Sequence, residues 1–96
     1  MTSQQFCRLA GRLMRHPAVP YHENAIRDEV ELICRENRLA CERDKFGNVL
    51  VRLQTNPEIR PLVLAAHMDH PGFKVRSTTG KTCVAKFLGG VPDSYF

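Results

Sequence analysis

The stretch LVLAAHMDHPGF, residues 62–73, decides how this chain is expected to fold. It begins as an apolar run and ends in two histidines and an aspartate, after which a Pro-Gly pair turns the chain. The apolar part has prolines near both ends and the length of a strand that is covered on both faces. We therefore predict a central β-strand over residues 61–68, with a polar cluster at its carboxyl end.

Two residues of this cluster, His67 and Asp69, lie two positions apart. Side chains two apart on a strand point to the same side, and open α/β sheets bind ligands beyond the carboxyl ends of their strands. A neutral imidazole is a good zinc ligand, and a carboxylate close by can accept a hydrogen bond from its other ring nitrogen. His-x-Asp alone is a common pattern, so a strand that merely ends at the surface is the alternative. His70 is expected to point away from His67 as a loop histidine.

The rest of the chain predicts two helices and two hairpins around this strand. Apolar residues recur with a helical period in the first third of the chain, and the period then changes to two. Gly47 and Gly80 mark the hairpin turns, and Ile26, Val30, Ile33 and Cys34 are expected to form the buried face of the second helix. The predicted elements are helices over 3–15 and 23–38 and strands over 39–46, 48–54, 61–68, 73–77 and 82–88. This order predicts an α/β fold in which two N-terminal helices precede a mixed β-sheet.

The composition excludes several classes of function. The 96 residues are 43% apolar and 25% charged, which is typical of a globular domain. No apolar run reaches the roughly 20 residues that span a bilayer, and the N-terminus has no secretory signal. Four cysteines without a CxxC pair favour reduced thiols in a cytoplasmic protein. The net charge of +4 is spread along the chain, and the stripe of Arg8, Arg12 and Arg15 is expected to be a solvated helix face. We predict neither a membrane nor a nucleic-acid partner.

Several motifs resemble one enzyme family. The segment AAHMDHPGF resembles the His-x-Asp-x-x-Gly-Phe motif of the co-catalytic zinc aminopeptidases. The closest group is the glutamyl aminopeptidase, or tetrahedral aminopeptidase, family. The helix start YHENAIRDEV, the turn DKFGNVLV and the closing AKFLGGVPD occur in the same order as in that family. The resemblance covers nearly the whole chain.

The resemblance implies roles for two residues. His67 would be a ligand of one of two zinc ions, or of cobalt or manganese, since His and carboxylate ligands suit several metals. Asp69 would be its acidic companion at the catalytic site. The implied reaction removes N-terminal residues from peptides through a metal-bound water, with a glutamate as general base, in a homo-oligomer. The implied fold is a three-layer α/β/α domain, with residues 1–88 as its N-terminal part and 89–96 as a connector into an inserted β domain.

The sequence departs from the family pattern in two ways. His70 stands where many members have glutamate, and the family's other metal ligands and its paired glutamates lie downstream of these 96 residues. Catalytic zinc usually needs three protein ligands, so the chain alone is expected to bind zinc weakly or not at all and to be inactive. The alternative function is a non-catalytic protein-interaction module that keeps the start of the fold. If strand 61–68 is central in the whole enzyme, the 96-residue chain leaves one of its edges unpaired, and this open apolar edge predicts self-association.

Overall fold

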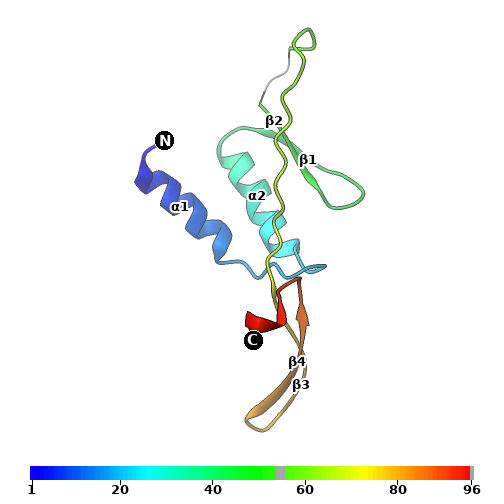
Figure 1. The fold of residues 1–96 in the computed structure, drawn as a ribbon. Helices are drawn as coiled ribbons and strands as arrows, with labels where there is room; N and C mark the ends of the chain where they lie inside the picture. The colour runs from blue at the N-terminus through cyan, green and yellow to red at the C-terminus, as the bar shows by residue number, and fades with distance from the viewer. Residues whose placement is uncertain (54–55, 96) are drawn as a thin grey trace.

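Two helices precede two antiparallel hairpins in the computed structural model, which describes residues 1–53 and 56–95 (Figure 1). The elements are α1 (Ser3–Met14), α2 (Asn24–Glu36), β1 (Ala40–Arg43), β2 (Val49–Arg52), β3 (Gly72–Thr79), β4 (Thr82–Leu88) and the 3-10 helix η1 (Asp93–Tyr95). The predicted α/β class is therefore confirmed, although the strands form two separate two-stranded sheets instead of one mixed sheet. Gln54 of the second predicted strand and Phe96 of the predicted connector lie outside the described residues.

The first helix begins at a capping box. The Thr2 hydroxyl accepts a hydrogen bond from the Gln5 backbone, and the Gln5 side chain accepts one from the Thr2 backbone at 2.7 Å. This exchange satisfies two backbone donors that a helix start otherwise leaves unpaired. The apolar face of α1 is only partly covered, since Leu9, Ala10 and Leu13 are half-buried while Phe6 is exposed.

Arg12 ties the two helices together. Its guanidinium donates to the carboxylates of Glu29, at 2.6 Å, and Glu36, at 2.5 Å, both on α2. The pairing lowers the pKa of the Glu36 carboxyl below its usual range, because a cation stabilises the carboxylate form. The prediction of a solvated arginine stripe is therefore wrong at this position, since Arg12 lies between the helices.

The buried residues lie along one face of α2 and in the loop before it. Ile26 and Cys34, eight positions apart on one face of α2, are buried together with Ala18 of the loop. Val30 and Ile33, on the predicted buried face, are half-buried. The helix ends at Glu36, and the Leu39 backbone N–H donates to the Cys34 carbonyl at 2.9 Å. This bond satisfies a carbonyl of the last turn and leads the chain directly into β1.

Side-chain hydrogen bonds stabilise the turn of the first hairpin. The Asp44 carboxylate accepts hydrogen bonds from the backbone N–H groups of Phe46 and Asn48 and from the Asn48 amide, each at 2.8 Å. These bonds hold the pKa of Asp44 below its usual value. Gly47 occupies φ +89°, a conformation that residues with a Cβ rarely adopt. The turn therefore shortens the predicted strand 39–46 to Ala40–Arg43.

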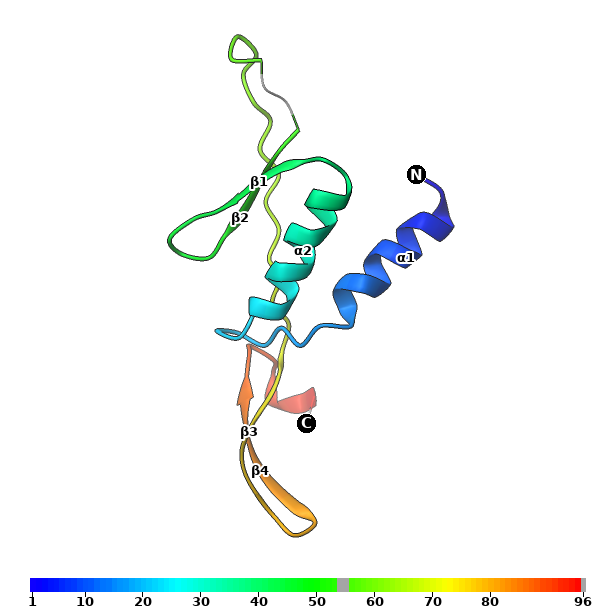
Figure 2. The same cartoon turned by 180° about the vertical axis from the view of Figure 1, so that it is seen from behind.

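The predicted central strand is the main error. Residues 61–68 belong to no strand, because β1 pairs with β2 and β3 pairs with β4 among the described residues. The segment runs past α2 as an extended chain (Figures 1 and 2). Leu62, Val63 and Leu64 are 87%, 79% and 87% exposed. The sequence pattern correctly predicted an apolar, extended segment. A β-strand, however, forms only where a second backbone exchanges hydrogen bonds with it.

The outcome is an open molecule. Its radius of gyration is 17.4 Å, whereas a compact domain of about 100 residues has about 13 Å. The second hairpin accounts for part of this length, because among the described helices and strands β3 and β4 contact only each other (Figure 1). Neither helix is long and apolar enough to cross a membrane among the residues described.

Candidate functional site

The polar cluster after the extended segment is anchored on the loop between the helices. The His70 backbone N–H donates to the carbonyl of buried Ala18 at 2.9 Å. Gly72 lies so close to the same loop that a Cβ added to it would be 2.5 Å from Cγ1 of Val19. Gly72 therefore permits close packing on this loop, and the two contacts fix where residues 67–69 lie.

Three segments that are far apart in the sequence surround one hollow of about 310 Å³. They are the start of α2 together with the loop before it, the β1–β2 turn, and the end of the extended segment. The lining residues fall within 21–27, 46–48 and 66–69. These segments belong to the stretches YHENAIRDEV, DKFGNVLV and AAHMDHPGF, so three motifs that resemble the aminopeptidases meet at one place.

His67 and Asp69 lie together at the wall of this hollow. The His67 ring Nδ1 is 2.8 Å from the Asp69 backbone oxygen and 3.3 Å from its carboxylate Oδ1. A carbonyl oxygen can only accept, so Nδ1 carries a proton, and in the neutral ring Nε2 then presents a lone pair. The His67 side chain is 84% exposed and the Asp69 side chain 39%. This is the ring tautomer in which an imidazole can bind a cation through Nε2 while a carboxylate holds its other nitrogen.

An arginine and a glutamate at the start of α2 line the same hollow. The Arg27 guanidinium donates to Glu23, the residue just before α2, at 3.2 Å and to Asn24 at 2.7 Å. Glu23 also accepts a hydrogen bond from the Tyr21 backbone N–H at 2.8 Å. The guanidinium packs on Gly47, where an added Cβ would lie 3.0 Å from its Cζ. Arg27 thus joins the helix start to the hairpin turn.

The structure places the sequence-predicted residues as follows. It brings His67 and Asp69 together, and it leaves His70 outside the hollow, with its Nδ1 donating to the Pro71 carbonyl at 3.2 Å. Phe73, at the start of a predicted strand, is 61% exposed and packs edge-to-face on Phe87, with ring centroids 5.4 Å apart. Within residues 1–53 and 56–95, no three His, Cys, Asp or Glu side chains are grouped to hold a metal ion.

Sequence reasoning missed the residues that line the hollow at the start of α2 and in the β1–β2 turn. The sequence suggests for Glu23 only a favourable position at the helix dipole, and it assigns no role to Arg27 or Phe46. Glu23 and Arg27 are four positions apart, the spacing at which opposite charges pair on a helix. That spacing could have identified the pair. Its position in the same hollow as His67 could not be predicted from the sequence, because it depends on how three segments pack.

Comparison with known proteins indicates a relationship to aminopeptidases over part of the chain. It is 42% identical over 67 residues to the Escherichia coli (strain K12) protein named "Putative aminopeptidase SgcX". The matched stretch covers 67% of this chain and 17% of that relative, so the chain spans about a sixth of the relative's length. No family model matches the chain. No solved structure matches it either.

Proposed function

We propose that this chain is the N-terminal part of a zinc-dependent aminopeptidase, a cytoplasmic homo-oligomeric enzyme that removes N-terminal residues from peptides. His67 serves as a ligand of one of two zinc ions, and Asp69 serves as its acidic companion. One observation carries the proposal: the Asp69 contacts leave Nε2 of His67 as a free acceptor at the wall of a hollow that three family-like motifs line. The identity to the E. coli relative supports the same conclusion.

The residues at this wall suit a divalent cation. An imidazole with Nδ1 engaged donates through Nε2, and a carboxylate beside it adds negative charge. Zinc, when bound, would act as a Lewis acid that activates water for attack on a peptide bond. In this chain Asp69 holds the ring of His67 in orientation, and the His70–Ala18 and Gly72–Val19 contacts hold the backbone that carries both residues.

The exposed apolar segment is a second reason to place the chain within a larger enzyme. Three consecutive large apolar side chains next to the site stand in solvent, which globular proteins rarely leave uncovered. Further polypeptide that pairs with residues 62–64 would cover them and could supply the remaining metal ligands. The isolated chain is accordingly proposed to bind zinc weakly and to have no peptidase activity, since catalytic zinc usually needs three protein ligands.

A zinc titration followed by NMR of the histidine rings tests the ligand assignment. We expect His67 to respond to zinc at millimolar rather than submicromolar concentration, and Asp69→Asn to weaken the response by roughly tenfold, as loss of a hydrogen-bonded partner typically does. His70→Ala is the matched control and should change nothing, whereas His67→Ala should abolish the response. A response centred on His70 or His22 would overturn the assignment. Submicromolar affinity, or hydrolysis of a leucyl anilide by the chain alone, would contradict the proposed weakness.

The alternative is a non-catalytic interaction module, which the exposed apolar segment equally permits. The coding sequence beyond Phe96 separates the two. A continuing reading frame with an aspartate, a Glu-Glu pair and a distal histidine is expected for the enzyme. A stop codon directly after Phe96 would favour the module.

A further inference from the structure

Two of the four cysteines lie on elements that pack directly on each other. Cys34 is in the last part of α2 and is 3% exposed, while Cys41 is the second residue of β1 and is half-buried. The Leu39–Cys34 backbone hydrogen bond of 2.9 Å places the start of β1 against the end of the helix. The two residues are therefore close in space as well as in sequence.

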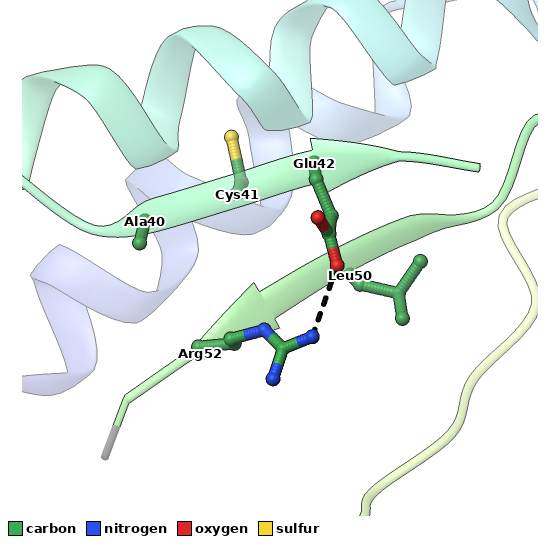
Figure 3. A pocket seen from close by; sticks show the side chains of 5 residues that line it. All are labelled: Ala40, Cys41, Glu42, Leu50 and Arg52. Carbon is green, nitrogen blue, oxygen red and sulfur yellow. Dashed lines mark hydrogen bonds and ion pairs between the residues drawn. The ribbon is translucent and has the colours of Figure 1, made fainter. Parts of the chain in front are cut away.

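The strand alternation aims both thiols at the same interface. Cys41 is the half-buried residue of β1, and its neighbours Ala40 and Glu42 are exposed. Figure 3 shows the Cys41 sulfur pointing toward the helix above it, whereas the Ala40 and Glu42 side chains point to the other face of the hairpin. Cys34 lies on the buried face of α2 that Ile26 also occupies. Each thiol therefore projects into the contact between α2 and β1.

We propose that Cys34 and Cys41 form an oxidisable dithiol, which small-molecule disulfides such as glutathione disulfide convert into a disulfide bond between α2 and β1. In the first step the Cys41 thiolate attacks glutathione disulfide, forms a mixed disulfide and releases one glutathione thiolate. In the second step Cys34 loses its proton to solvent and attacks the Cys41 sulfur, releasing the second glutathione thiolate. Two protein thiols and one glutathione disulfide thus yield one protein disulfide and two glutathione thiols.

The environments of the two sulfurs set this order. Burial raises the pKa of the Cys34 thiol, and its hydrogen bond with the Cys41 thiol raises the pKa further. Cys34 is therefore a poor first nucleophile at neutral pH, because the thiolate is the reactive form. Cys34 is 3% exposed, whereas Cys41 is half-buried and therefore more open to solvent. Reagents reach it first.

The bond would affect the candidate site through the hairpin. β1 leads directly into the turn that carries Phe46, Gly47 and Asn48, which line the hollow beside His67. The ion pairs of Arg43 with Asp28 and Glu31 already tie this strand to α2, at 2.9 and 2.8 Å. A disulfide two residues earlier would add a covalent tie at the same contact.

Oxidation of the 96-residue chain with glutathione disulfide, followed by a non-reducing tryptic map, tests the proposal. Trypsin cuts between the two cysteines, so the bond joins peptide 28–35 (DEVELICR) to peptide 39–43 (LACER). We expect this linked pair in the wild type, with the exposed Cys7 and Cys83 as glutathione adducts. Cys34→Ala should leave a stable glutathione adduct on Cys41. Cys41→Ser should leave Cys34 unmodified because it is buried.

The same reaction in urea separates the folded geometry from mere closeness in sequence. The equilibrium constant for the Cys34–Cys41 bond is expected to be at least about tenfold higher in the folded chain, because the fold raises the effective concentration of the two thiols. Circular dichroism checks that both variants keep the helices. The proposal fails if Cys41 of the wild type keeps its glutathione adduct, if Cys34 pairs with Cys7 or Cys83, or if urea leaves the equilibrium constant unchanged.

Discussion

Replacing Gly72 by alanine should loosen the anchor that holds the polar cluster in place. The new Cβ would lie 2.5 Å from Val19 Cγ1, and ordinary contacts begin at 3.4 Å, so the two segments need to separate by 3.4 − 2.5 = 0.9 Å. Overpacking of this kind destabilises a protein by about 1–3 kcal/mol. Strain in the neighbouring His70–Ala18 hydrogen bond could add up to about 1 kcal/mol to this loss. We expect the free energy of unfolding to fall by about 2–3 kcal/mol.

Urea denaturation followed by far-UV circular dichroism measures this loss, and amide hydrogen exchange of His70 shows where it occurs. Gly90→Ala is the matched control, because a Cβ there meets open space and the backbone is not in the left-handed region. It should change the stability by less than about 0.5 kcal/mol. Val19→Ala removes the atom that the new Cβ would strike. The double variant should therefore lose at least about 1 kcal/mol less than the sum of the single variants.

Two results would refute this reasoning. One is an equal change in stability for Gly72→Ala and Gly90→Ala. The other is an undiminished cost of Gly72→Ala when Val19 is already replaced by alanine. Either would mean that the contact between Gly72 and Val19 does not fix the position of residues 67–69, and that the hydrogen bond to Ala18 holds them alone.

Three other elements give measurable outcomes. Gly47→Ala should weaken the β1–β2 hairpin by about 1–2 kcal/mol, read from amide exchange, because of its positive φ and the approach to Arg27 Cζ at 3.0 Å. Acid should open the same turn: the pKa of Asp44 is lowered by folding, so its contribution is complete above its ordinary pKa of 3.8 and is lost as the pH falls through the lowered folded value. An NMR pH titration measures this loss, which Asp44→Asn should not show. The chain should also self-associate through residues 62–64, so light scattering should report more than the monomer mass of 10.9 kDa, and Val63→Lys should reduce it. A stable monomer at high concentration would contradict that expectation.

The parts of the fold that depend on neighbouring residues could be predicted from the sequence. Both helices lie within one or two residues of the predicted bounds, and both hairpins turn where Gly47 and Gly80 indicate. The segment 61–68 was predicted wrongly because its state depends on a distant partner strand. A run of apolar residues without alternation indicates that the segment prefers to be buried. It does not indicate which other segment, if any, pairs with its backbone.

The candidate site shows the same division between local and distant effects. The pairing of His67 with Asp69 was predicted from strand alternation, yet it occurs in a segment that is not a strand. The contact does not require a strand, because the two residues are close enough along the chain for Nδ1 of His67 to reach both the backbone and the carboxylate of Asp69. The wall formed by Glu23 and Arg27 was missed, since packing of three separate segments creates it. The metal-binding role of the pair is still a prediction.

The exposed segment 62–64 and the exposed ring of His67 are neighbours, so burial of one affects the other. Residues 62–64 end three positions before His67 on the same extended segment, so a surface that covers them can extend to that ring. A strand that pairs with the segment would fix its backbone and reduce the exposure of the His67 side chain, which stands at 84%. An imidazole held on both sides loses less conformational entropy when it binds a cation. Covering the segment should therefore raise the metal affinity of His67 even before the covering surface contributes a ligand of its own.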